Sequence, residues 1–334
     1  MPDVYLGELI RWLALTLGTE LFVVKCLITL VVMCLLCGMV GAMVVGNRMA
    51  FFSDAMAHCA FAGIALGYLS VVFSHSSRAT ASWLVPLVMV LFGIAIGAAM
   101  VYVRDRTGLA HDTVIGVFFA LALGFGAMLV RLVREVSNVD LETFLFGNLF
   151  LIPESDLLLL LLALVLVAVV FLGRYNQLMF ASFNPSLART RRMNVTMNNY
   201  LFIIVLALVV NLSIKAVGAL LINALLVVPA AAAANVSRNL RQMFWLTVAF
   251  SLTAGLVGYW VSSRFTLSIG SVRNVSFGPS GVIVVATVGL FFASMAVAAV
   301  WNRFAPIFGA PQFRRPMHNP HDPCGVDHPF GPCP

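Results

Sequence analysis

An aspartate and a histidine stand four residues apart in a stretch that otherwise consists of apolar and small residues. On a helix, Asp54 and His58 would lie one turn apart on the same face. Ionisable residues inside an apolar span usually point into a helix bundle or a water-filled path. A carboxylate and an imidazole together suit divalent zinc, manganese or iron. The pair therefore predicts contact with a divalent metal ion.

Two protein ligands do not complete the coordination shell of such an ion. A second copy of the helix across a two-fold axis would supply another carboxylate and another imidazole. In an alternative interpretation, Ser53 and Asp54 cap the start of the helix, and His58 is a buried histidine with satisfied hydrogen bonds. The residue pattern alone leaves both interpretations open.

The composition of the chain places this pair in a membrane protein. Of the 334 residues, 61% are hydrophobic and 10% are charged, whereas soluble domains are roughly a quarter charged. The apolar residues form blocks of about 20, the length that crosses a bilayer as a helix. The sequence therefore predicts an all-α bundle of about eight or nine transmembrane helices. The net charge of +7 comes from arginines in loops and does not indicate nucleic-acid binding.

Three regions follow from the pattern of apolar blocks. Residues 1–19 are expected to form an interfacial segment, and residues 20–302 the transmembrane domain. Residues 303–334 form a tail that contains Pro, His and Cys and cannot build a core. Arginines collect mainly in alternate loops, which predicts an external N-terminus and a cytoplasmic C-terminus.

A second informative stretch surrounds Pro229. Proline removes a helical N–H, so the apolar helix is expected to kink or end there and to be followed by a short alanine-rich helix at Ala230 and Ala231. With Arg238 and Arg241 just beyond, this helix could sit in a cleft of a cytoplasmic partner. A proline kink followed by a close-packed alanine helix explains the pattern equally well.

The motifs resemble the integral-membrane permease subunit of ATP-binding-cassette importers for zinc, manganese and iron. The matching motifs occur in family order and cover roughly residues 20 to 301. They are Arg48 to Gly63, His111 to Gly116, Val139 to Asn148, Phe183 to Ala188, Val217 to Ala230 and Gly278 to Gly281.

The resemblance implies a multi-pass protein of the bacterial plasma (inner) membrane that forms a homodimer or a heterodimer with a sister permease. It further implies cytoplasmic ATP-binding subunits and an extracytoplasmic metal-binding protein as partners. Asp54 and His58 match the family's metal-contacting positions, and the segment after Pro229 resembles the helix that couples to the ATPase. No permanently bound cofactor is implied, since zinc, manganese or iron is cargo.

The chain departs from the family at the coupling segment. The family tends to carry a threonine and a basic residue soon after the proline, where this chain has Ala230 to Ala234. Contacts with the ATPase are therefore expected to shift toward Arg238 and Arg241. The sequence also lacks a phosphate-binding GxxxxGK[ST] loop, so energy for uphill transport would come from another subunit.

Two other classes of function remain open on the residues. A membrane-embedded metal enzyme could use Asp54 and His58, but it would need a third ligand and a general base at the same depth. A carrier driven by a proton or ion gradient would work without an ATPase. The resemblance favours a transport subunit that is not an enzyme.

Overall fold

The computed structural model of the chain describes residues 2–18, 20–47, 49–73, 78–136, 152–183, 188, 194–264, 266–269, 272–276 and 278–304. Nearly all of the tail expected at residues 303–334 and the whole motif from Val139 to Asn148 lie outside the described residues.

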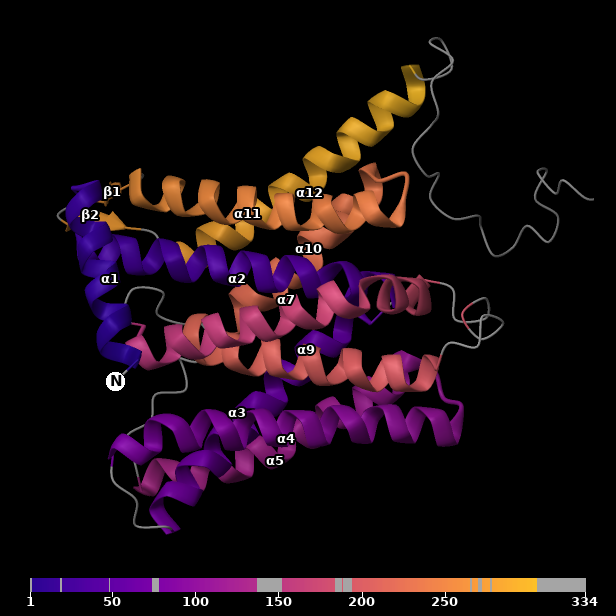
Figure 1. Cartoon of the computed structure of the whole chain (residues 1–334), viewed down its shortest axis with the longest axis horizontal. Coiled ribbons are helices and arrows are strands. Elements are labelled where there is room, and N and C mark those ends of the chain that lie inside the picture. Colours follow the sequence, from indigo (N-terminus) through magenta and orange to yellow (C-terminus); the bar gives the residue numbers. More distant parts are fainter. Residues whose placement is uncertain are drawn as a thin grey trace, which may run out of the picture.

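The described residues form a bundle of long apolar helices and one short antiparallel hairpin (Figure 1). The helices are α1 (Pro2–Leu17), α2 (Leu21–Gly46), α3 (Ala50–Phe73), α4 (Arg78–Thr107), α5 (His111–Val136), α7 (Glu154–Phe183), α9 (Val195–Val217), α10 (Ala219–Val236), α11 (Leu240–Arg264) and α12 (Pro279–Phe304). Strands β1 (Thr266–Ile269) and β2 (Val272–Ser276) pair between α11 and α12.

Within the described part of the chain, nine helices are long and apolar enough to cross a membrane, α2 to α12. Helices suit this environment because every backbone hydrogen bond is satisfied within the segment. The expected all-α bundle of eight or nine spans is confirmed, with nine. The β1–β2 hairpin is an addition that the apolar pattern did not predict.

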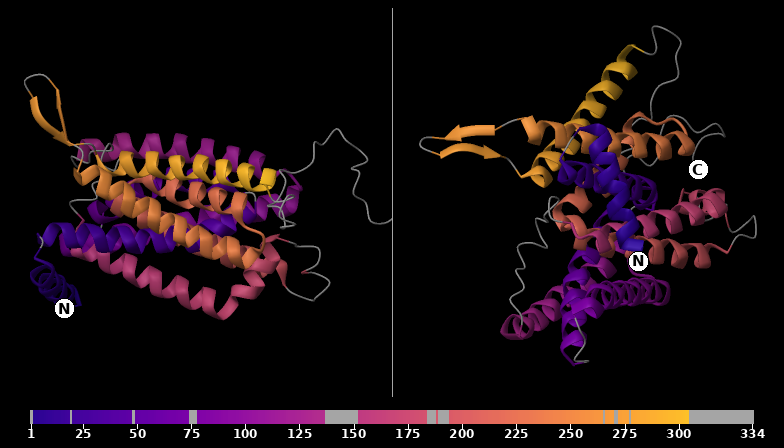
Figure 2. Two further views of the ribbon diagram at one scale, coloured as in Figure 1. Left: turned by 90° about the horizontal axis from the view of Figure 1, so that it is seen from above. Right: turned by 60° about the vertical axis from the view of Figure 1, so that its left-hand side comes forward.

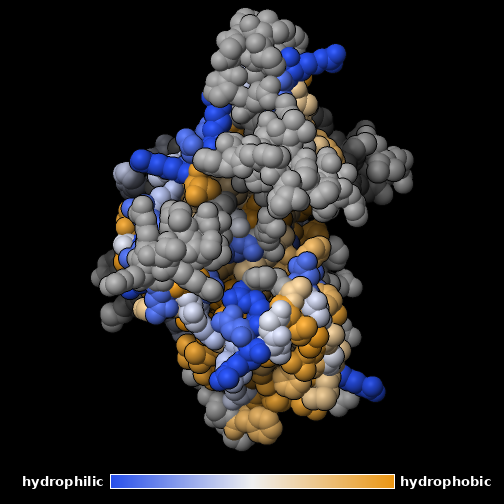
Figure 3. All heavy atoms as spheres, turned by 90° about the vertical axis from the view of Figure 1, so that its right-hand side faces the viewer, coloured by the Kyte–Doolittle hydropathy of each residue, from blue (hydrophilic) through white to orange (hydrophobic). Residues whose placement is uncertain are grey.

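The two ends of the bundle differ in composition. We call the end with α1 and the β1–β2 hairpin the hairpin end, and it lies at the left of Figure 1. We call the opposite end the arginine end, and Figure 3 shows hydrophilic residues on it beside apolar ones. Its arginines lie at the end of α4, in or near the α10–α11 turn and in the last turn of α12. The described arginines at these places are Arg104, Arg106, Arg238, Arg241 and Arg303.

Helix α2 is the centre of the core and packs against α7, α10 and α11. Its side chains are buried on nearly every side, among them Met33, Leu36 and Met43. The approach of α10 is especially close, because a Cβ atom at Gly41 would overlap the carbonyl oxygen of Leu226. Only glycine permits two backbones to come so near. Gly41 therefore sets the position of α10 against the centre of the bundle.

Helix α1 lies across the hairpin end rather than along the bundle (Figure 2). Its buried face, Ile10 and Ala14, packs on Val24 of α2 and Leu157 of α7. Its other face leaves Trp12 65% exposed. This two-sided pattern is typical of a helix at a membrane interface, where the ring of a tryptophan is often found.

Candidate metal-contact site

Asp54 and His58 lie one turn apart on α3, as their spacing predicts. The Nε2 atom of His58 is 4.0 Å from the Oδ1 atom of Asp54. The side chain of His58 is 25% exposed and that of Asp54 is 47% exposed. In a single subunit, both side chains are therefore partly accessible to solvent or to an ion.

The structure does not support the capping interpretation. Helix α3 begins at Ala50, so Asp54 lies in its second turn rather than before its first. Ser53 is buried, and its hydroxyl donates a hydrogen bond to the carbonyl oxygen of Ala50 at 3.0 Å. Neither side chain is therefore placed to cap the first free N–H groups of the helix.

The pair lies well inside the bundle. Helix α4 packs against α3 beside Asp54. A Cβ atom at Gly97 of α4 would be 3.7 Å from Cζ of Phe52 and 3.9 Å from Sδ of Met56. These two residues lie two positions before and after Asp54. Gly97 lies ten residues before Thr107, where α4 ends, which corresponds to about 15 Å of helix at about 1.5 Å per residue. Gly97 is 19 residues from Arg78 at the other end of α4, or about 28 Å by the same rise, so the site lies inside the bundle but nearer its arginine end.

Sequence reasoning missed a third member of the site, Asn223 of α10. Its side-chain Nδ2 donates a hydrogen bond to Oδ1 of Asp54 at 2.9 Å. The other amide atom, Oδ1 of Asn223, is buried and has no hydrogen-bond partner among the described residues. One signal was available, since Asn223 is the only polar residue between Lys215 and Asn235.

Aromatic rings enclose the imidazole of His58. The ring of Phe119 on α5 meets it edge-on with centroids 4.8 Å apart, and the ring of Phe61 is 5.9 Å away. The described residues give His58 no hydrogen bond and only the 4.0 Å approach to Asp54. The ring is therefore held in place by apolar contacts, and its nitrogens are not committed to a protein partner.

One chain does not complete a metal site here. Within the described residues, no group of three or more His, Cys, Asp or Glu side chains could hold a metal ion. Asp54 and His58 supply one oxygen and one nitrogen donor, and zinc in proteins takes four ligands in most sites. The arrangement suits brief contact with a passing ion, or a site that a second chain completes.

The residues expected at the coupling segment are arranged differently from the prediction. Pro229 lies inside one continuous helix, α10, which runs to Val236, so the separate short helix expected after it is not formed. Ala230 is buried and Ala231 is partly buried. The reason is packing, because this half of α10 lies against α12, where Asn235 donates a hydrogen bond to Ser294 at 3.2 Å.

The two arginines of this segment are placed at the surface of the arginine end. Arg238 and Arg241 are both exposed. The guanidinium of Arg238 lies 5.7 Å from the centre of the Trp301 ring on α12, and its backbone N–H donates to Oε1 of Gln242 at 3.0 Å. The alanines therefore pack within this chain, whereas the arginines are accessible to a partner.

Two ion pairs near the hairpin end were also missed by sequence reasoning. Lys215 of α9 lies 2.6 Å from Asp156 of α7, and Lys25 of α2 lies 3.3 Å from Glu154 of α7. Asp156 is only 7% exposed. Both acids lie in the first turn of α7, where a negative charge also interacts favourably with the helix dipole. These pairs join α7 to two neighbouring helices.

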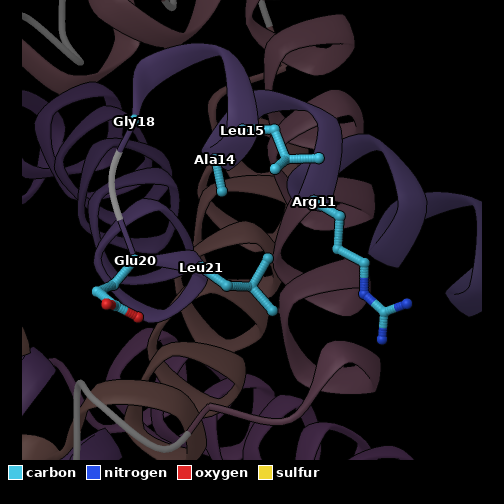
Figure 4. Close-up of a pocket in the computed structure, with 6 residues that line it drawn as sticks. All are labelled: Arg11, Ala14, Leu15, Gly18, Glu20 and Leu21. Atoms are coloured by element: carbon cyan, nitrogen blue, oxygen red, sulfur yellow. The ribbon is translucent and has the colours of Figure 1, made fainter.

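A hollow of about 560 Å³ lies where α1 meets the start of α2 (Figure 4). It is lined by Arg11, Ala14, Leu15, Gly18, Glu20 and Leu21. Its two charged side chains have opposite signs, and neither belongs to the Asp54–His58 pair. The hollow therefore offers no set of ligands that resembles a cation site.

A bundle of nine apolar spans with an ionisable pair inside it is typical of polytopic membrane transport proteins. The chain belongs to the ABC 3 transport family, whose profile matches residues 20–298. It is accordingly a multi-pass bacterial membrane protein of a transport system rather than an enzyme, and the resemblance found in the sequence is confirmed.

Individual relatives are similar over most of their length. The chain is 27% identical over 272 residues to the manganese transport system membrane protein MntC of Listeria innocua, covering 81% of this chain and 89% of that protein. It is 29% identical over 269 residues to the high-affinity zinc uptake system membrane protein ZnuB of Haemophilus influenzae, covering 80% and 95%. The solved structure of PsaBC from Streptococcus pneumoniae in complex with Fab matches the fold with a TM-score of 0.70 and 24% identity, covering 87% of this chain and 97% of that one.

Proposed function

We propose that the chain is the permease subunit of an ATP-driven importer and that Asp54 and His58 contact a divalent transition metal ion as it crosses the membrane. The observation that carries this proposal is the position of the pair, which lies inside the bundle with both side chains partly exposed. Ionisable residues within membrane spans are costly, and they typically face the bundle interior or a water-filled cavity and mark pathways for ions or substrates. Relatives named for manganese and for zinc transport support a metal cargo.

The donor set admits zinc, manganese and ferrous iron. One carboxylate oxygen and one imidazole nitrogen per chain suit all three ions, and geometry and availability rather than ligand type would choose among them. A dimer, with an identical or a sister permease, would place two such pairs around one path. Four donors would then complete the coordination that a single chain leaves open.

The arginine end is proposed to face the cytoplasm, where positively charged loops are favoured. Its exposed arginines would then meet the ATP-binding subunits, and the hairpin end would face an extracytoplasmic metal-binding protein. Because Ala230 is buried, we assign docking chiefly to Arg238 and Arg241 of the α10–α11 turn. Reversing both charges to glutamate is expected to leave ATP hydrolysis running without metal uptake. Unchanged coupling in proteoliposomes would count against this assignment.

Metal uptake into proteoliposomes that contain the whole importer tests the site. We expect Asp54→Asn and His58→Ala each to abolish ATP-dependent uptake of radioactive zinc or manganese while the complex still assembles. Asp105→Asn is the matched control, because Asp105 is an exposed carboxylate that pairs with Arg104 at 2.9 Å on the arginine end. Wild-type uptake by both site variants would remove the proposal.

The same vesicles distinguish the rival mechanism of a gradient-driven carrier. Uptake by vesicles that hold this chain alone, driven by a pH gradient and insensitive to vanadate, would favour the carrier. Uptake that requires the ATP-binding subunits and stops with vanadate would support the importer.

A further inference from the structure

Asn223 is the only described side chain that donates a hydrogen bond to Asp54, and it comes from a different helix. An ionised carboxylate only accepts hydrogen bonds, so the amide must turn its NH₂ group toward Asp54 and its oxygen away. That oxygen is the buried atom without a partner. Leaving a buried acceptor unpaired is unfavourable. The orientation of the amide is therefore set by Asp54 and not by its own surroundings.

The hydrogen bond makes the two oxygens of the carboxylate different. Asn223 and His58 both approach the same oxygen, Oδ1, at 2.9 Å and 4.0 Å. The hydrogen bond to Oδ1 restricts rotation of the carboxylate about its Cβ–Cγ bond. Oδ2 has no hydrogen bond among the described residues. The ligand would thus be oriented before the ion arrives, which lowers the entropic cost of binding.

The backbone around Asn223 explains how it reaches this position. Helix α9 ends at Val217, and α10 begins at Ala219 after a single residue, Gly218, with a φ of 94°. Such a positive φ is readily adopted only by glycine. Asn223 lies just over one turn into α10, and Gly41 of α2 holds that helix close one turn further on, at Leu226. The amide is thus carried on a rigid and tightly packed segment.

We propose that Asn223 is a positioning residue for metal capture, which orients the carboxylate of Asp54 from α10. This inference rests on the proposed function of Asp54 and adds a residue to it. Hydrogen-bonded partners of ligating side chains typically account for about 10- to 100-fold in metal affinity. The contact also links the metal site to the helix that ends beside Arg238, so the position of α10 and the orientation of Asp54 are connected.

The test measures the dissociation constants of Mn²⁺ and Zn²⁺ for the purified whole importer, together with uptake kinetics. Asn223→Leu removes the donor at similar volume and is expected to raise the dissociation constant about 10- to 100-fold. The half-saturating metal concentration should rise more than the maximal rate falls, because the lost interaction belongs to binding. Asn223→Gln keeps the amide and should bind metal more tightly than Asn223→Leu.

Asn211 of α9 provides a matched control. It is a buried asparagine whose Oδ1, like that of Asn223, has no partner among the described residues, but its Nδ2 donates to the backbone oxygen of Ala207 at 2.6 Å. We expect Asn211→Leu to leave the dissociation constant within about twofold of wild type, since it loses a contact outside the site. An equal shift in both variants would overturn the inference, because the effect would then be general loosening of the bundle.

The outcomes separate this inference from the proposed function. If Asp54→Asn abolishes metal binding but Asn223→Leu leaves it unchanged, Asn223 has no positioning role and the proposed function stands. If Asp54→Asn itself leaves binding unchanged, the proposed function fails and the inference fails with it. If the Asn223→Leu complex does not assemble, Asn223→Ser is measured against the same thresholds, because its shorter side chain cannot span the same gap.

Discussion

Carboxylates in two regions of this bundle have different kinds of partner. In the first turn of α7, Asp156 and Glu154 each face a lysine, at 2.6 Å and 3.3 Å. Inside the bundle, Asp54 accepts a hydrogen bond from a neutral amide and has a histidine 4.0 Å away. A fixed cation neutralises the first two carboxylates permanently. The described surroundings of Asp54 supply no such fixed charge, which leaves it available for a cation that comes and goes.

Supplying Asp54 with a permanent cation should have the largest effect. Asn223→Lys would replace the neutral amide by an ammonium group, as Lys215 provides for Asp156. The competing charge should abolish metal uptake at every metal concentration tested, because it occupies the carboxylate that the ion needs. Uptake of radioactive manganese by the reconstituted importer measures this, with size-exclusion chromatography to verify assembly. Near-normal uptake would show that Asp54 is not a ligand.

Removing the buried acid of the hairpin end should affect stability rather than transport chemistry. Asp156→Asn leaves the charge of Lys215 unpaired at a site where Asp156 is 7% and Lys215 is 19% exposed. Breaking a buried pair in this way costs about 3–5 kcal/mol. Thermal unfolding of the purified complex should shift to lower temperature, while the metal dissociation constant of the folded fraction stays unchanged. A changed dissociation constant would contradict the separation of the two regions.

The exposed acid of the same turn should matter least. Glu154 is 43% exposed and lies 3.3 Å from Lys25. Solvent screens such a pair, and exposed ion pairs contribute less than about 1 kcal/mol. Glu154→Gln should therefore change the unfolding temperature by much less than Asp156→Asn in the same assay. Equal shifts would mean that the ion pair with Lys25 is as important to the fold as the buried one.

The number and course of the spans could be predicted from sequence because the bilayer restricts the chain so strongly. The apolar block that begins at Leu21 coincides with the start of α2. The apolar block from Leu157 to Gly173 is shorter than the helix that contains it, because α7 runs from Glu154 to Phe183. The additional residues include the acids of the first turn and polar residues after Gly173. They interrupt the apolar pattern, whereas the hydrogen bonding of the helix continues through them.

Only the part of the candidate site that lies on a single helix was predictable from the sequence. Spacing along one helix places Asp54 and His58 on one face. Asn223 lies 169 residues further along the chain, and no periodicity in a single sequence shows which helices meet. The burial of Ala230 was hidden for the same reason, because it depends on how α2, α11 and α12 pack around α10.

The closeness of α2 and α10 at Gly41 has a consequence for how the chain can vary. A methyl group at Gly41 would push against the backbone at Leu226 and displace α10, together with the asparagine one turn before it. Gly41 has no side chain and lies on α2, which supplies no ligand. It nevertheless determines whether Asn223 can form its hydrogen bond with Asp54. A substitution at Gly41 could therefore alter the preferred cargo by shifting the backbone of α10, without any change in the residues that donate to the metal.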